Sequence, residues 1–177
     1  MRALRYFLPI LFIALPTFAQ SSLRDGQRDF DFEIGTWKTH IRRLLRPLSG
    51  RNDWVEYEGT TVVSKVMDGK ANLAELKVFG SGGLIEGVSL RLYNPMTRKW
   101  SLNYANLGNG QLTTPSIGEF KNGRGEFYNE EKYDGRTITV RFLIIKVTND
   151  EYRFEQSFSV DRQTWELNWI AVDRRVK

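Results

Sequence analysis

Apolar and polar residues alternate along most of the chain, in short segments that turns separate. The alternation is clearest over Val88 to Leu92, Trp100 to Tyr104, Tyr152 to Phe158 and Trp165 to Ala171. A period of two buries one face of a β-strand, and no segment of helical length shows a convincing period of 3.6. The pattern therefore predicts an all-β protein in which each strand has one buried face.

Turn-forming residues recur at short, regular intervals, and Asp-Gly and Asn-Gly are strong hairpin signals among them. The turns are expected at Pro47 to Asp53, Asp68-Gly69, Gly80 to Gly83, Asn94-Pro95, Gly108 to Gly110, Asn122-Gly123, Asp134-Gly135, Asn149-Asp150 and Asp161-Arg162. Nine turns separate ten strands. The fold class we expect is a single antiparallel up-and-down β-barrel of about ten strands.

Loop lengths predict how the strands pair. We take a five-residue loop after Tyr93 and a four-residue loop after Val160. The expected cross-strand pairs are Leu92 with Trp100, Leu90 with Leu102, Phe158 with Leu167, and Gln156 with Trp169. Because the buried faces agree across both hairpins, the pattern supports these registers.

Segment 137–147 carries apolar residues on both faces. A two-residue turn at Asp134-Gly135 would pair Phe142 with Phe127 and Val140 with Asn129, which leaves Arg141 outside. A slip of one residue would bring Arg141 inward, so both positions of this side chain remain open.

The N-terminal residues resemble a secretory signal peptide. Arg2 and Arg5 precede the apolar stretch Leu8 to Leu15, and Thr17 to Ala19 supply small residues for cleavage near Ala19. The apolar stretch is shorter than the roughly 20 residues that a membrane-spanning helix needs. We expect a signal peptide at 1–19, a disordered leader at 20–28 and a barrel domain at 29–177, exported to the periplasm or outside the cell.

Charge and composition restrict the partners. Cleavage removes two basic residues and no acidic one, which lowers the net charge from +5 to +3. No basic run is interleaved with aromatic residues, so we expect no nucleic-acid partner, and no stable membrane insertion. The chain has no Cys and no clustered carboxylates, and its single histidine, His40, is expected on the outer face, so we expect no metal and no cofactor.

The run from Phe30 to Trp37 opens the barrel domain. Phe30, Phe32 and Ile34 suit an apolar plug in a short 3₁₀ turn, and Gly35 allows a tight approach to the first strand, in which Trp37 points inward. The Gly-x-Trp core resembles the short motif of the lipocalins. That resemblance implies that Trp37 closes the base of the barrel against Arg174 or Arg175, near the end of the last strand.

The resemblance extends over nearly all of the mature chain. Its further motifs are Leu-Tyr-Asn-Pro-Met-Thr-Arg-Lys-Trp at 92–100, Tyr-Asp-Gly-Arg at 133–136, Phe-Glu-Gln-Ser-Phe-Ser at 154–159 and Thr-Trp-Glu-Leu-Asn-Trp at 164–169. Together they are similar to a family of exported bacterial lipocalin-like proteins of unknown function. The resemblance implies a calycin-type barrel and no particular activity.

Polar residues at inward positions are the candidates for ligand contacts. Gln156 interrupts the face of Phe154 and Phe158 and lies opposite Trp169, so its amide either joins an internal network or contacts a ligand. Tyr104 offers its hydroxyl either to a cavity or to solvent at a rim. The full candidate set for ligand binding is Gln156, Trp169, Phe154, Phe158, Tyr104, Asn129, Glu131 and Arg141.

Three functions remain open at this point. The leading one is a non-catalytic barrel that binds a small hydrophobic or amphipathic molecule in its lumen. The second is an isomerase- or hydrolase-like enzyme on an apolar substrate, acting through Glu131 or Arg141; no Ser-His-Asp or Cys-His set can be assembled for it. The third is a filled barrel, with Trp165, Trp169 and Phe158 inside, that binds proteins through Leu143, Ile145, Ile170 and Val172 on its outer face.

Overall fold

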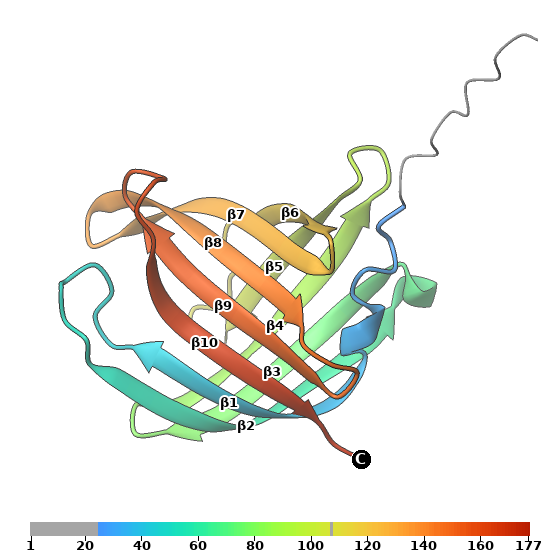
Figure 1. Ribbon diagram of the computed structural model, residues 1–177, viewed down its shortest axis with the longest axis horizontal. Helices are drawn as coiled ribbons and strands as arrows, with labels where there is room; N and C mark the ends of the chain where they lie inside the picture. Colours follow the sequence, from blue (N-terminus) through green and yellow to red (C-terminus); the bar gives the residue numbers. More distant parts are fainter. Residues whose placement is uncertain (1–24, 107) are drawn as a thin grey trace, which may run out of the picture.

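The computed structural model describes residues 25–106 and 108–177, which form a closed barrel of ten antiparallel strands (Figure 1). Each strand pairs with its neighbours in the sequence, and β1 pairs with β10 to close the barrel. The strands are β1 (Gly35–Leu44), β2 (Trp54–Val66), β3 (Ala71–Gly80), β4 (Gly83–Asn94), β5 (Lys99–Asn106), β6 (Ser116–Lys121), β7 (Arg124–Tyr133), β8 (Arg136–Lys146), β9 (Glu151–Ser159) and β10 (Glu166–Arg175). The predicted up-and-down barrel is confirmed. Within the described residues, no helix has the length and apolar character needed to cross a bilayer.

The two ends of the barrel differ. One end, which we call the base, is covered by the 3₁₀ turn η1 (Asp31–Glu33); a second turn, η2 (Met67–Gly69), joins β2 to β3. The opposite end, which we call the rim, carries the β3–β4, β7–β8 and β9–β10 turns and the segments 45–53 and 108–115. Phe30 is buried at the base, where its ring meets Trp100 and Phe120 edge-on, with centroids 4.9 Å apart in each pair. The expected apolar plug therefore exists, in a 3₁₀ turn.

Residues 25–28, which the sequence assigns to the leader, lie against the base of the barrel just before η1. The amide of Gly26 donates to the Tyr93 hydroxyl at 3.0 Å, and its carbonyl accepts from the Trp100 indole at 2.9 Å. Residues 25–28 therefore belong to the barrel's base. The expected signal peptide at 1–19 and residues 20–24 lie outside the described residues.

The register of β8 follows the Asp134-Gly135 turn. Phe142 pairs with Phe127, and Val140 pairs with Asn129. The backbone at both turn residues has positive φ, as the primed hairpin turn requires. Arg141 therefore lies on the outer face.

The predicted register of the β4–β5 hairpin is wrong by one residue. Trp100 pairs with Tyr93 rather than Leu92, and Leu102 pairs with Arg91. The loop has four residues instead of five, and Arg98 adopts a positive φ of 57° within it. Because side chains alternate along a strand, this shift places Arg91 inside the barrel and moves Val88, Leu90 and Leu92 to the outer face.

A β-bulge in β10 changes a second predicted register. Gln156 pairs with Trp169 as expected, but the pairing shifts between Leu167 and Trp169, so Phe158 faces Glu166 instead of Leu167. Asn168 is the extra residue of the bulge and is buried. A bulge reverses the alternation on the strand that carries it, and Trp165 consequently leaves the lumen for the outer face.

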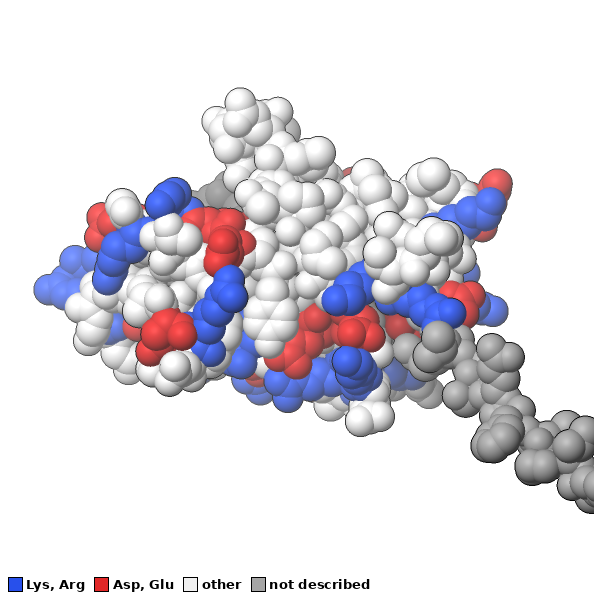
Figure 2. All heavy atoms as spheres, turned by 90° about the horizontal axis from the view of Figure 1, so that it is seen from above, with Lys and Arg blue, Asp and Glu red and all other residues white. Residues whose placement is uncertain are grey.

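The four outer-face residues proposed for protein binding are largely covered. Leu143 is only 6% exposed, and Ile145, Ile170 and Val172 are half-buried. Figure 2 shows one face of the molecule, where basic and acidic side chains lie in small mixed groups beside a broad area without charge. On this face no field of a single sign is present.

Candidate functional site

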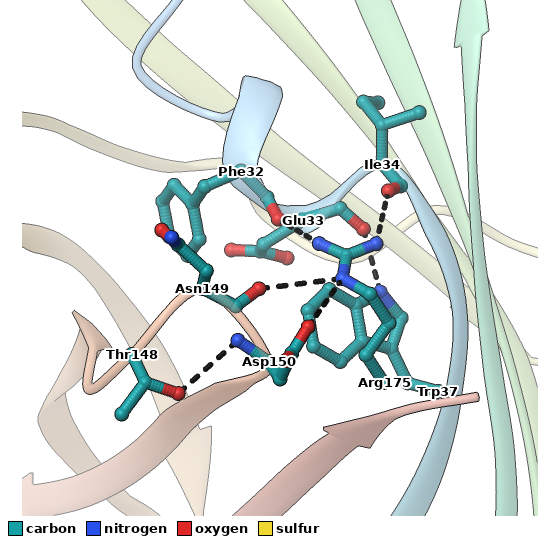
Figure 3. A network of polar contacts seen from close by, with 8 residues as sticks. All are labelled: Phe32, Glu33, Ile34, Trp37, Thr148, Asn149, Asp150 and Arg175. Carbon is teal, nitrogen blue, oxygen red and sulfur yellow. Dashed lines mark hydrogen bonds and ion pairs between the residues drawn. The ribbon is translucent and has the colours of Figure 1, made fainter. Parts of the chain in front are cut away.

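The base of the barrel is closed by Trp37 and Arg175 (Figure 3). The Trp37 ring is 1% exposed, and the Arg175 guanidinium lies 4.0 Å from its centroid, a cation–π distance. Of the two basic residues expected for this contact, Arg175 makes it, while Arg174 is exposed and pairs with Glu151 at 3.0 Å. Trp37 therefore packs inward against the last strand.

Arg175 is also well supplied with acceptors. Its Nη1 donates to the Ile34 carbonyl at 2.9 Å, its Nη2 to the Phe32 carbonyl at 2.8 Å, and its Nε to the Asn149 carbonyl at 3.3 Å. The Trp37 indole in turn donates to the Glu33 carbonyl at 2.6 Å. These bonds tie η1 to the end of β10, so this end of the barrel is a fixed closure.

Gly35 makes the closure possible. Its φ of 132° is strained for any residue with a side chain, and a Cβ there would lie 2.6 Å from Arg175 Nη1. The Gly-x-Trp motif thus combines a backbone bend with room for the guanidinium.

Above this closure the lumen holds a cavity of about 680 Å³. It extends from Glu33 and Asp173 at the base to the rim, where Leu84 and Gly108 line it and are exposed to solvent. Its walls are largely apolar; the lining side chains of this kind are Ile41, Leu76, Ile85, Leu102, Phe142, Ile144, Phe154, Phe158 and Trp169. A cavity of this size suits a small organic molecule.

The floor of the cavity contains a buried ion pair that the sequence did not reveal. Glu33 in η1 is 0% exposed, and its Oε2 accepts a hydrogen bond from Arg91 Nη1 at 2.6 Å. The guanidinium of Arg91 also lies 4.5 Å from the Phe30 centroid. Yet Glu33 Oε1 and Arg91 Nε have no partner in the described structure. A buried polar atom left without a partner costs about 1–3 kcal/mol, so this pair is incompletely satisfied.

A second carboxylate lies at the same floor. Asp173 accepts a hydrogen bond from the Thr39 hydroxyl, which is itself 2.6 Å from the Thr61 hydroxyl. Burial, helped by the negative charge of Glu33, raises the pKa of Asp173 from 3.8 to about 6, although the bond from Thr39 opposes the shift. Burial likewise raises the pKa of Glu33, against the opposing charge of Arg91. Among the described residues, the floor therefore carries two carboxylates, the Arg91 guanidinium and the buried hydroxyl of Tyr152, which pairs with Asp173 across β9 and β10.

Gln156 lies halfway up the wall and fits both alternatives that the sequence left open. Its Nε2 donates to Asn168 Oδ1 at 2.8 Å, so the amide belongs to an internal network with the bulge. The same side chain lines the cavity, together with Phe154, Phe158 and Trp169. Contact with a ligand remains a prediction for all four.

At the mouth of the cavity, Tyr104 and Glu131 are in the lining. Burial raises the pKa of the Tyr104 hydroxyl, and the charge of Arg43 across the lumen acts in the opposite direction. Gly87 leaves space for this ring, because a Cβ there would lie 2.4 Å from the Tyr104 hydroxyl oxygen. Asn129 is buried beside Glu131, to whose Oε1 its amide donates at 2.7 Å, and it is not part of the lining.

Arg141 is not part of the site, contrary to its place among the candidate ligand-binding residues. It lies on the outer face with its guanidinium 4.2 Å from the Trp165 centroid. The β7–β8 turn fixes this position, and the bulge brings Trp165 to the same face. Both residues are excluded from the lumen for reasons of register.

The candidate site residues that sequence reasoning missed are Glu33, Arg91 and Asp173, which line the cavity. Alternation from Trp169 and Ala171 places Asp173 inward, so the sequence pattern could have predicted its place in the lumen. Arg91 was hidden by the one-residue error in the β4–β5 loop. Glu33 lies in a single 3₁₀ turn, which is too short to show a period.

The described residues contain no group of three or more His, Asp or Glu side chains placed to hold a metal ion. His40 is half-buried on the outer side of β1, where its Nε2 lies 3.5 Å from Glu56 Oε2. It stands apart from the cavity lining.

Comparison with known proteins agrees with the fold. No family model matches the chain, and no curated protein matches it. The S-type phycobiliprotein lyase CPES from Guillardia theta is similar in structure, with a TM-score of 0.55 and 14% identity over 84% of this chain and 90% of that one. EF1p2_mFAP2b bound to DFHBI has a TM-score of 0.47 and 9% identity over 85% and 99% of the two chains. A fluorescence-activating beta barrel of de novo design has a TM-score of 0.41 and 15% identity over 87% and 100%. At 14% identity, the likeness to the lyase shows the fold alone, a closed antiparallel β-barrel.

Proposed function

We propose that this protein is a non-catalytic barrel that binds a small hydrophobic or amphipathic molecule in its lumen. The observation that carries the proposal is the cavity of about 680 Å³, whose walls are apolar and which reaches from the rim to the base. Ligand pockets of about 300 to 1,000 Å³ with apolar walls and few polar groups are typical of small-molecule sites. Because Trp37 and Arg175 close the base, the ligand enters through the rim.

The cavity bears differently on the two alternatives. A filled barrel is not supported, because the lumen holds a cavity and Trp165 lies outside it. An enzyme that depends on Arg141 lacks that residue in its lumen, whereas Glu131 lines the cavity, so an enzyme acting through Glu131 stays an alternative. Apolar burial along Phe154 and Trp169 supplies affinity, and Gln156 and Tyr104 are the polar groups that orient the ligand from the wall and the mouth.

Two tryptophan substitutions on neighbouring residues of β4 test the proposal. Ser89 lines the cavity, whereas Val88 is 37% exposed on the outer wall. Ser89→Trp adds bulk inside the lumen and should abolish the fluorescence increase of the uncharged probe N-phenylnaphthylamine. Val88→Trp adds the same bulk outside and should leave probe binding unchanged.

Native mass spectrometry of the freshly purified protein provides an independent readout. A co-purified small molecule that Ser89→Trp displaces would support the lumen as the site. If the wild-type protein binds no probe and repeatedly carries no molecule, the proposed function is wrong.

We also propose that the protein acts in the bacterial envelope or outside the cell. The signal-like residues 1–19 support this, and the chain has no Cys whose thiol could carry a lipid anchor. N-terminal sequencing of the protein from a bacterial host's envelope fraction should begin at Gln20. An intact Met1 in cytosolic protein would contradict export.

A further inference from the structure

The floor of the cavity has an acceptor that no described residue uses. Glu33 Oε1 is buried and has no hydrogen-bond partner among the described residues, while the other oxygen of the same carboxylate is bound by Arg91. Figure 3 draws no hydrogen bond or ion pair between this carboxylate and Arg175, whose guanidinium bonds to backbone carbonyls and pairs with Asp150. Glu33 lines the cavity, so a bound molecule is in position to supply the missing donor.

The groups around Glu33 determine which head group fits. Asp173, the second carboxylate of the floor, is 2% exposed and also lines the cavity. Among the described residues, Arg91 is the guanidinium that lines the floor of the cavity. Its Nη1 donates to Glu33, and its Nε is a buried donor without a partner that a hydroxyl oxygen on the ligand suits. A ligand carboxylate would bring a third anionic group to one cation, and like charges at close range in a buried site are strongly unfavourable. A donor on the ligand meets no such repulsion.

We infer that the lumen takes a small apolar molecule whose buried end carries an N–H or O–H donor, such as an amine or a hydroxyl, and that this group donates to Glu33 Oε1. Molecules with a carboxylate at that end are rejected. The inference rests on the proposed lumen function and adds to it the chemistry and orientation of the ligand: the donor lies at the closed base, and the apolar body lies along Phe142, Phe154 and Trp169.

Four probes with one naphthalene body test the inference by titration calorimetry at neutral pH. They are naphthylmethylamine, naphthylmethanol, methylnaphthalene and naphthoate. We expect the amine or the alcohol, or both, to bind at least tenfold more tightly than methylnaphthalene, and naphthoate to bind most weakly. Comparing the affinities of the amine and the alcohol shows whether the site prefers a cationic or a neutral donor.

Glu33→Gln reverses the chemistry at one atom while keeping the shape. Arg91 retains an acceptor in the amide oxygen, and the amide nitrogen replaces the free acceptor with a donor. The preference for the donor probes should fall at least tenfold, and naphthoate should gain affinity. Glu58→Gln makes the same change at an exposed position on the outer side of β2 and should leave the order of affinities unchanged.

The outcomes separate this inference from the proposed function. Equal affinity for all four probes would overturn the inference, with a buried water then satisfying Glu33, and would leave the lumen as a binding site. A donor preference that survives in Glu33→Gln would also overturn it. Failure of all four probes to bind the wild-type protein would overturn the proposed function as well. Because the probe series on the wild-type protein decides the preference, the test holds even if the variant does not fold.

Discussion

Two arginines contact η1 and the residue that follows it, and their surroundings differ. Arg175 donates to the three carbonyls of Ile34, Phe32 and Asn149 and covers the Trp37 ring. Arg91 has one hydrogen bond, to Glu33, and leaves its Nε without a partner. Both side chains reach the same short turn, one from β10 and the other from β4.

The difference separates a structural closure from a candidate site. Two of the Arg175 bonds satisfy carbonyls, of Phe32 and Ile34, that an isolated 3₁₀ turn would leave free, and the third ties the β8–β9 turn to them, so the interactions there serve stability. The Glu33–Arg91 pair is buried and incompletely bonded, and such pairs often contribute no net stability. Groups of this second kind are expected where a protein binds a ligand, because an unsatisfied buried atom is itself a recognition element.

Removal of Arg175 should have the largest effect on stability. Arg175→Met leaves the carbonyls of Phe32 and Ile34 without a donor, at about 1–3 kcal/mol each, and removes a cation–π contact of about 0.5–2 kcal/mol. We expect the free energy of unfolding to fall by about 5 kcal/mol in urea titrations.

The neighbouring Arg174→Met is the matched control. Arg174 is exposed, so its ion pair with Glu151 should contribute at most about 1 kcal/mol. If the two variants are equally stable, the base is not held by Arg175 and the comparison fails.

The Glu33–Arg91 pair should respond differently. Arg91→Met leaves the Glu33 carboxylate buried without its partner and should lower the free energy of unfolding by about 3–4 kcal/mol. Replacing both residues with methionine removes both charges and keeps a similar volume, so the double variant should regain most of that loss or exceed the wild-type protein.

The double variant thus tests whether the Glu33–Arg91 pair serves ligand binding or, like Arg175, the stability of the fold. We expect it to be stable and to lose the preference for donor probes, measured by urea unfolding and calorimetry on the same samples. A double variant that is as unstable as Arg91→Met would show that the pair supports the fold as Arg175 does.

Much of the closure could be predicted from the sequence, because Gly35 and Trp37 stand in a short motif that resembles that of the lipocalins. That resemblance implied a contact of Trp37 with Arg174 or Arg175, and the structure assigns it to Arg175. The turn at Asp134-Gly135 likewise fixed the side of Arg141, since that dipeptide specifies one loop length.

The floor of the cavity was harder to predict, because it depends on registers that the sequence encodes weakly. The loop between β4 and β5 has no dipeptide that sets its length, and one residue fewer turned Arg91 inward. The bulge at Asn168 contains no glycine that would have predicted it from the sequence. It places Trp165 on the outer wall instead of in the expected core. An error of one residue thus changes the chemistry of a lumen while leaving the barrel itself intact.

The smallest expected effect on stability is the pH dependence that comes from Asp173, which lies with Arg91 at the floor of the cavity. Its pKa is raised from 3.8 to about 6 by burial, helped by the nearby charge of Glu33. Between these pH values the folded protein binds more protons at this residue than the unfolded chain, so the stability that Asp173 contributes is present at acid pH and is lost as pH rises through about 6. Asp173→Asn removes this titration and keeps an acceptor for Thr39.

We therefore expect the stability of Asp173→Asn relative to the wild-type protein to increase by about 3 kcal/mol as the pH is raised from about 4 to about 7, in urea titrations. Asp150→Asn is the control on the Arg175 side: Asp150 is exposed and lies 3.6 Å from Arg175 Nε, so its relative stability should change by less than about 1 kcal/mol over the same range. A flat difference for Asp173→Asn would mean that its carboxylate is as well solvated as that of Asp150. The floor would then lack the two closely placed, buried carboxylates from which the preference for a donor head group is inferred.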